Sequence, residues 1–179
     1  MPSPRDFVLT AEIAIRGSRE SDLPCLEWFG LFTEHRELIQ DAFHRQQAGE
    51  VLMLVADLNG FPVGQLWLDL TGKRSEDVGI LWALRVFPFL QNRSIGRRLI
   101  GAGEQELEER GYGWAEIGVD KDEPRAGSLY RRLGYEPKSM AREEYSYHNP
   151  AGALIRVPVE LRLFRKRLNA RGSRAYSQL

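Results

Sequence analysis

The segment from residue 79 to residue 119 constrains the fold more than any other part of the chain. It begins with the apolar run GILWALRVF (79–87) and ends with a second strand-like run, GWAEIGV (113–119). Between them, residues 95–110 carry apolar or small side chains every four positions, and Gly111 follows where a helix C-cap is expected. This strand–helix–strand unit indicates an α/β fold.

Hairpins are predicted on both sides of this unit. The apolar runs 51–56 and 63–70 flank Asn59-Gly60, a dipeptide typical of a β-hairpin turn. A long closing hairpin is predicted between residues 139 and 166, around a turn that contains Pro and Gly. We therefore expect a mixed sheet of about seven strands flanked by helices, in the order β-α-α-β-β-β-α-β-α-β-β.

Two helices are predicted between the first strand, at 11–18, and the first hairpin. The stretch SRESDLPCLEWFGLF (18–32) offers Ser21 or Asp22 as an N-cap and places Pro24 in the first turn, which is typical of a helix start. The second helix is expected between residues 35 and 50, where the apolar residues form one stripe.

The chain length of 179 residues suits one domain with its own hydrophobic core. We expect a single domain over residues 1–179, with its core at about 13–165. Six basic residues and no acid lie between residues 162 and 174. We therefore interpret residues 166–179 as a basic tail that is solvated and partly disordered.

Composition excludes several classes of function. The formal net charge is zero, which argues against nucleic acid as a partner. Cys25 is the only cysteine, so neither an intrachain disulfide nor a cysteine-based zinc site is expected, and His35, His44 and His148 lack metal-site spacing. No secretory signal and no apolar run of about 18 residues is visible, so we predict a cytoplasmic protein with no membrane partner and no metal.

The polar turn at residues 91–96 is a candidate anion site. The first N–H groups of the helix that follows have no intrahelical partner, and the helix dipole adds positive charge there. Gly96 has no Cβ, so a ligand can approach its backbone closely. An ordinary loop is the other interpretation, because neither GxxxxGK[ST] nor GxGxxG is present.

The segment LRVFPFLQNRSIGRRLI (84–100) resembles the acyl-CoA-binding motif of the GNAT family of N-acetyltransferases. The residues that match the family pattern are Val86, Pro88, Gln91 and Gly96. Ser94 stands where the family has a glycine. A Ser at that position costs roughly 1 kcal/mol or more if it must adopt a positive φ.

A second segment, RAGSLYRRLGYEP (125–137), also resembles the family. Glu123 stands where many members have an asparagine. The matching residues are Ala126, Leu129, Tyr130, Gly134 and Tyr135.

The resemblance implies a V-shaped opening between the strands at 80–87 and 114–119, with acetyl-CoA as co-substrate. The pantetheine arm would pair with the backbone of Leu84, Arg85 and Val86. Gln91 and Glu123 are further candidates for cofactor contacts. The pyrophosphate would lie on the N–H groups of Asn92, Arg93, Ser94, Ile95, Gly96 and Arg97.

Tyr130 matches the family's general acid, which would protonate the leaving thiolate; the other interpretation is that its ring only packs. The strand before the turn contains no acid, so Asp77, Glu116 and Asp69 are all candidates for the general base. We predict an N-acyltransferase that moves an acetyl group to a primary amine of a small molecule or peptide. The alternative is a non-catalytic acyl-CoA-binding regulatory module. Whether the chain forms a homodimer is left open.

Overall fold

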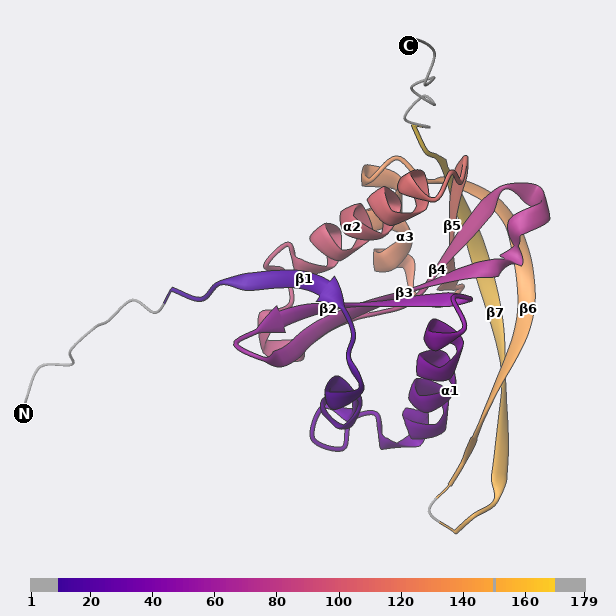
Figure 1. The fold of residues 1–179 in the computed structure, drawn as a ribbon. Helices are drawn as coiled ribbons and strands as arrows, with labels where there is room; N and C mark the ends of the chain where they lie inside the picture. Colours follow the sequence, from indigo (N-terminus) through magenta and orange to yellow (C-terminus); the bar gives the residue numbers. More distant parts are fainter. Residues whose placement is uncertain (1–9, 150, 170–179) are drawn as a thin grey trace, which may run out of the picture.

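A computed structural model describes residues 10–149 and 151–169, and within them seven strands form one mixed sheet. The strand order across the sheet is β1-β2-β3-β4-β5-β7-β6. Helices α2 and α3 cover one face, and α1 covers the other (Figure 1). The bounds are β1 Ile13–Gly17, α1 Arg36–Gln47, β2 Val51–Leu58, β3 Phe61–Lys73, β4 Val78–Val86, α2 Ile95–Glu109, β5 Trp114–Asp120, α3 Pro124–Arg132, β6 Glu136–His148 and β7 Leu154–Arg167.

The strand pairing follows from the connections between strands. Strands β2 and β3 form an antiparallel hairpin, as do β6 and β7. Strands β4 and β5 pair in parallel because α2 carries the chain back across one face of the sheet before β5 begins. The predicted mixed sheet and the predicted order of strands and helices along the chain are confirmed, except that a 3-10 helix stands in place of the first helix.

Helix α2 lies close to the sheet because its buried stripe contains a glycine. Leu99, Ile100 and Leu107 are buried on this stripe. A Cβ built on Gly103 would come within 2.8 Å of the Leu66 side chain on β3. The absence of a side chain at Gly103 therefore sets the separation between α2 and the strands below it.

The helix predicted at 18–32 is shorter and tighter than expected. The chain forms a 3-10 helix over Glu20–Glu27 and then enters left-handed backbone at Trp28 (φ 43°) and Phe29 (φ 57°). The Trp28 ring is 2% exposed, and its Nε1 donates to the Pro62 carbonyl oxygen at 2.8 Å. This tertiary contact of Trp28 overrides the local preference for a longer helix.

Asp22 does not act as the predicted N-cap residue. The residue that precedes the 3-10 helix is Arg19, and its N–H donates to the Asp22 carboxylate at 2.7 Å. The same carboxylate pairs with the guanidinium of Arg16 on β1. Asp22 thereby ties the 3-10 helix to the first strand.

The basic run near the C-terminus is partly structural. Strand β7 continues to Arg167, and Leu168 is 4% exposed. Arg165 pairs with Glu116 at 2.7 Å, and Lys166 pairs with Glu104 at 2.7 Å. The ordered sheet therefore includes residues 166 and 167, which were assigned to the tail, while residues 170–179 lie outside the described part of the chain.

Candidate active site

The candidate site lies where β4 and β5 separate. Their parallel pairing runs from Val78 and Trp114 to Leu81 and Ile117 and does not continue beyond that pair. Strand β4 goes on to Val86, still paired with β3. The V-shaped opening expected between these two strands is present.

A bulge in β4 coincides with the start of the opening. Gln65 pairs with Arg85 and Trp67 pairs with Trp82, so two residues further along β3 correspond to three along β4. Ala83 holds φ at 53° inside this bulge. A bulge bends its strand and increases the local twist, which turns the end of β4 away from β5.

The opening forms a cleft of about 940 Å³ that β4, the polar turn, α2 and α3 line together. It gathers all but one of the predicted cofactor residues, together with Tyr130. Arg93 is the exception, since it lies in a separate hollow beside β1. The lining residues predicted from sequence are Leu84, Arg85, Val86, Gln91, Asn92, Ser94, Ile95, Gly96, Arg97, Glu123 and Tyr130.

Five further residues line the cleft and were not singled out as site residues. Four of them have apolar side chains, and three of those lie on or just after α3, at the spacing i, i+3, i+7. This spacing is the signal that could have identified the α3 face. The five residues are Leu90, Ala126, Leu129, Arg132 and Leu133.

The N-terminus of α2 opens into this cleft. The first hydrogen bond of the helix runs from the Arg98 N–H to the Ser94 carbonyl oxygen at 3.0 Å. The N–H groups of residues 95–97 therefore have no partner inside the helix. Together with the helix dipole, these N–H groups can hold an anionic group.

Two residues of this turn, Asn92 and Ser94, adopt left-handed backbone. Ser94 has φ 63° and makes no side-chain cap, and Asn92 has φ 60°. Ser94 thus has the positive φ that is strained for a residue with a Cβ. Gly96 does not have a positive φ, and a Cβ there would meet only the Val86 side chain, at 3.6 Å.

Tyr130 extends from α3 into the apolar lining of the cleft. Its ring is 6% exposed and packs against Tyr135 and Phe164, with ring centroids 6.0 and 6.3 Å away. Burial raises the pKa of the Tyr130 hydroxyl to about 12. The phenol is therefore protonated at neutral pH and can donate a proton.

None of the three candidate bases lines the cleft. Glu116 is 2% exposed, and its carboxylate pairs with Lys73 at 2.5 Å and Arg165 at 2.7 Å. Asp77 is exposed and precedes β4, at the end of the strand opposite the opening. The sheet therefore does not bring either of these acids to Tyr130.

Asp69 is held in a network of its own. Its carboxylate accepts N–H bonds from Thr71 and Gly72, both at 2.8 Å, and pairs with Arg45 at 3.0 Å. Burial acts to raise the pKa of Asp69, but these N–H groups and the Arg45 charge outweigh it and hold the pKa below its usual value. A carboxylate stabilised in this way is a weak base.

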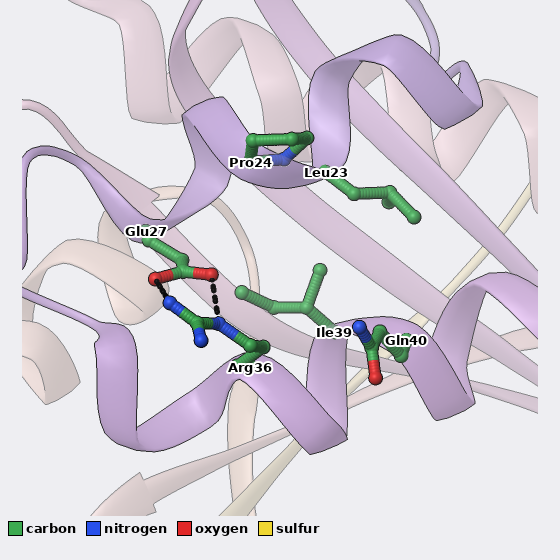
Figure 2. Close-up of a pocket in the computed structure, with 6 residues that line it drawn as sticks. All are labelled: Leu23, Pro24, Glu27, Arg36, Ile39 and Gln40. Atoms are coloured by element: carbon green, nitrogen blue, oxygen red, sulfur yellow. Dashed lines mark hydrogen bonds and ion pairs between the residues drawn. The ribbon is translucent and has the colours of Figure 1, made fainter.

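A smaller hollow of about 280 Å³ lies between the 3-10 helix and α1. Figure 2 shows the Glu27 carboxylate and the Arg36 guanidinium joined across its edge by two hydrogen bonds, at 2.6 and 2.8 Å. Leu23, Pro24 and Ile39 provide its apolar walls. Because this ion pair already satisfies the charged groups, the hollow offers less chemistry than the cleft.

Within residues 10–149 and 151–169, no group of three or more His, Cys, Asp or Glu side chains could hold a metal ion. No helix in that part of the chain has the length and apolar character needed to cross a membrane.

The family model described as Acetyltransferase (GNAT) family matches residues 19–135. The chain belongs to the GNAT family. This match includes all of β4, α2 and α3, and therefore the whole lining of the cleft. The resemblance that was inferred from the two motifs is thus confirmed.

A curated GNAT relative matches part of the chain. Mycothiol acetyltransferase from Clavibacter sepedonicus is 33% identical over 89 residues, which are 50% of this chain. The chain spans only 28% of the length of that relative.

Solved structures show the same GNAT fold. The ribosomal-protein-S18-alanine N-acetyltransferase from Escherichia coli superposes with a TM-score of 0.68 at 20% identity, covering 93% of this chain and 100% of its own. The PaiA N-acetyltransferase from Thermoplasma acidophilum, solved in complex with coenzyme A, gives a TM-score of 0.63 at 17% identity and covers 87% and 99%.

Proposed function

We propose that this chain is an N-acetyltransferase that moves an acetyl group from acetyl-CoA to a primary amine of a small molecule or peptide. The observation that carries the proposal is the cleft itself. It combines a free edge of β4, the free N-terminus of α2 and the protonated phenol of Tyr130. The acetyltransferase names of the relatives support acetyl as the transferred group.

The residues of the cleft fit coenzyme A. Beyond Leu81 the edge of β4 that faces β5 has no strand partner, so its backbone groups other than the Val86 carbonyl, which accepts from Gln91, can pair with the amides of a pantetheine arm. The N–H groups at the start of α2 suit a pyrophosphate. The absence of a side chain at Gly96 leaves space beside Val86 for a ligand to approach.

Two other residues of the cleft lining have narrower roles. Gln91 donates from its side-chain amide to the Val86 carbonyl oxygen at 3.2 Å, so it holds the end of β4 against the turn. Glu123 brings a carboxylate to the same cleft. Its charge would repel a phosphate, so Glu123 is expected to weaken cofactor affinity rather than support it.

The reaction is a direct transfer. The acceptor nitrogen attacks the thioester carbonyl, a C–N bond forms, the C–S bond breaks, and Tyr130 gives its proton to the departing sulfur. The proton lost by the nitrogen passes to solvent, because the three candidate acids do not line the cleft, and the Tyr130 phenolate takes a proton back from solvent. No cysteine lines the cleft either, so the proposed transfer does not pass through a cysteine thioester.

The second candidate function is a non-catalytic acyl-CoA-binding module. Ser94 in left-handed backbone, the Glu123 carboxylate in the cleft and the absence of the three candidate bases from its lining all favour this alternative. Tyr130 favours catalysis, because a binding module does not need a phenol at this position. The expected compartment for either function is the cytoplasm, in keeping with a single cysteine.

Calorimetry with acetyl-CoA, followed by a thiol-release assay over a panel of amines, separates these functions. Binding with turnover supports the transferase. Binding without turnover on any amine supports the module. An absence of heat at millimolar acetyl-CoA contradicts both.

A further inference from the structure

The face of the sheet that packs against α1 contains buried polar atoms that lack hydrogen-bond partners among the described residues. Gln65 lies opposite Arg85, and Trp67 lies opposite Trp82, on strands β3 and β4. Cross-strand neighbours such as these share one face of a sheet. We call these four residues the donor patch. Its unpartnered atoms are Nη1 of Arg85, Nε2 and Oε1 of Gln65, Nε1 of Trp67 and Nε1 of Trp82.

Arg85 is the charged member of the donor patch. Its guanidinium lies 4.1 Å from the centre of the Phe32 ring, and no carboxylate in the described part of the chain pairs with it. Burial lowers the pKa of Arg85, while the nearby Tyr145 acts to raise it. Arg85 is only partly exposed, and a charge held away from water without a counter-ion is costly.

The surroundings of Arg85 supply no hidden anion. His35 stands nearby on the segment before α1; burial and the Arg85 charge lower its pKa, and Glu34 acts in the opposite direction. Glu34 is exposed, and Glu37 pairs with His148 at 2.9 Å. The acids on the neighbouring elements are therefore solvated or already paired.

The donor patch favours an anion over a cation. Each of its four side chains offers N–H donors, and the only acceptor among the unpartnered atoms is Oε1 of Gln65. A guanidinium matches a carboxylate with two parallel hydrogen bonds. Water could satisfy single donors, but it would not neutralise Arg85.

Arg85 also borders the cleft. It lines the cleft together with Tyr130 and lies between Leu84 and Val86 on β4. The other charged residues of the lining are Arg97, Arg132 and Glu123. Three arginines against one glutamate give the side chains of the cleft lining a net positive charge.

We propose that the acceptor is an amino acid or a similar amine that carries a carboxylate, and that Arg85 and Gln65 bind this carboxylate while the amine faces the thioester. This proposal rests on the proposed acetyl transfer and names the acceptor class of the same site. The carboxylate completes the hydrogen bonds of the donor patch and neutralises Arg85. Held there, it orients the amine beside Tyr130.

Matched pairs of acceptors test this proposal. β-Alanine with ethylamine, glycine with methylamine, and phenylalanine with 2-phenylethylamine differ within each pair only by the carboxylate. For the wild-type protein, kcat/KM should favour the acid in at least one pair by roughly 10- to 100-fold, the worth of a hydrogen bond to a charged group. Thiol release measures kcat/KM, and calorimetry measures acetyl-CoA affinity separately.

Three variants make the test specific. Arg85→Gln should reduce the acid-to-amine ratio to within about threefold of unity while acetyl-CoA still binds, since a lost charge contact acts on the acceptor alone. Gln65→Met, which keeps a similar volume, should lower the same ratio by a smaller factor. It replaces Arg85→Gln in the test if that variant does not fold. Arg110→Gln is the matched control, because Arg110 pairs with Glu106 at the far end of α2 and should leave the ratio unchanged.

The possible outcomes separate the two proposals. Equal use of both members of every pair, or an equal loss of both in Arg85→Gln, overturns the acceptor class and leaves acetyl transfer intact.

If no amine is acetylated, thermal melting in the presence of coenzyme A decides. A larger midpoint rise with the acids in wild type than in Arg85→Gln supports the proposal, and no difference overturns it. Failure of acetyl-CoA to bind in calorimetry instead rejects the proposed function.

Discussion

Ser94 accepts the first hydrogen bond of α2, from the N–H of Arg98 at 3.0 Å, while its own backbone holds φ at 63°. The residue that precedes α2 therefore holds a backbone conformation that an L-amino acid adopts at a cost. The side chain of Ser94 does not offset this cost, because it makes no capping hydrogen bond.

Ser94→Gly should stabilise the protein by up to about 1 kcal/mol and tighten acetyl-CoA binding. Glycine adopts positive φ without the steric cost of a Cβ, although its greater freedom in the unfolded chain offsets part of the gain. Urea denaturation and calorimetry measure the two effects. Ser94→Ala keeps the Cβ and is the control, so an equal gain in Ser94→Ala would contradict this explanation.

Gly96→Val should remove acetyl-CoA binding and leave the fold nearly unchanged. A Cβ at Gly96 has ordinary contact distance to Val86, so the free protein has room for it, but a branched side chain would occupy the ligand's approach to the turn. Arg93→Ala is the comparison, and it should cost about 1 kcal/mol of binding or less, because Arg93 lies outside the cleft. Calorimetry that ranks the two variants in the reverse order would indicate a charge-driven site elsewhere.

Tyr130→Phe should lower kcat by about 10²- to 10⁴-fold with little change in acetyl-CoA affinity. In the proposed mechanism the hydroxyl acts only as the thiolate leaves, whereas the ring keeps its contacts with Tyr135 and Phe164. Thiol release and thermal melting separate lost chemistry from lost stability. Tyr135→Phe is the matched control, since Tyr135 is buried in the same cluster but does not line the cleft. Unchanged turnover in a stable Tyr130→Phe protein would remove Tyr130 from the mechanism.

Asp22→Asn should destabilise the protein by about 2–3 kcal/mol at neutral pH, because Asp22 is 3% exposed and its partner Arg16 would lose a charged acceptor. The hydrogen bonds from Arg16 hold the pKa of Asp22 below its usual value. The Asp22 carboxylate therefore stabilises the fold above about pH 4, and this contribution is lost as pH falls through the lower folded-state pKa.

Urea denaturation of wild type and Asp22→Asn at several pH values measures this contribution. The difference between the two proteins should shrink towards acid pH. Glu27→Gln removes the exposed pair with Arg36 and should cost at most about 1 kcal/mol. A pH-independent difference for Asp22→Asn would show that the charge of Asp22 is not what stabilises the junction.

The regular elements of the fold could be predicted because their signals are local. The apolar runs of β2, β3 and β4 and the four-residue spacing in α2 are visible within single segments. The helix at 18–32 was wrong because its end depends on Trp28, whose ring bonds to Pro62, a residue 34 positions away. No local pattern contains that information.

The cleft residues that lie in the two sequence motifs could be predicted. The contacts between side chains that are distant in sequence could not. The lining residues follow from two motifs that lie close together in sequence. The pairing of Glu116 with Lys73 and Arg165 depends on the neighbours of β5 on both sides. The bulge at Ala83 has no sequence signal, because alanine is not a residue that favours positive φ.

The separation of β4 from β5 leaves a vacant strand position in the interior of the sheet rather than at its periphery. An outer edge is open to any extended chain, which makes it a risk for aggregation. Here the gap is walled by α2 and α3, so a slender ligand with two or three amides can fill it and the strand of another protein cannot. Amide hydrogens along the end of β4 should therefore exchange quickly with deuterium in the free protein and slowly once acetyl-CoA takes the place of the missing strand.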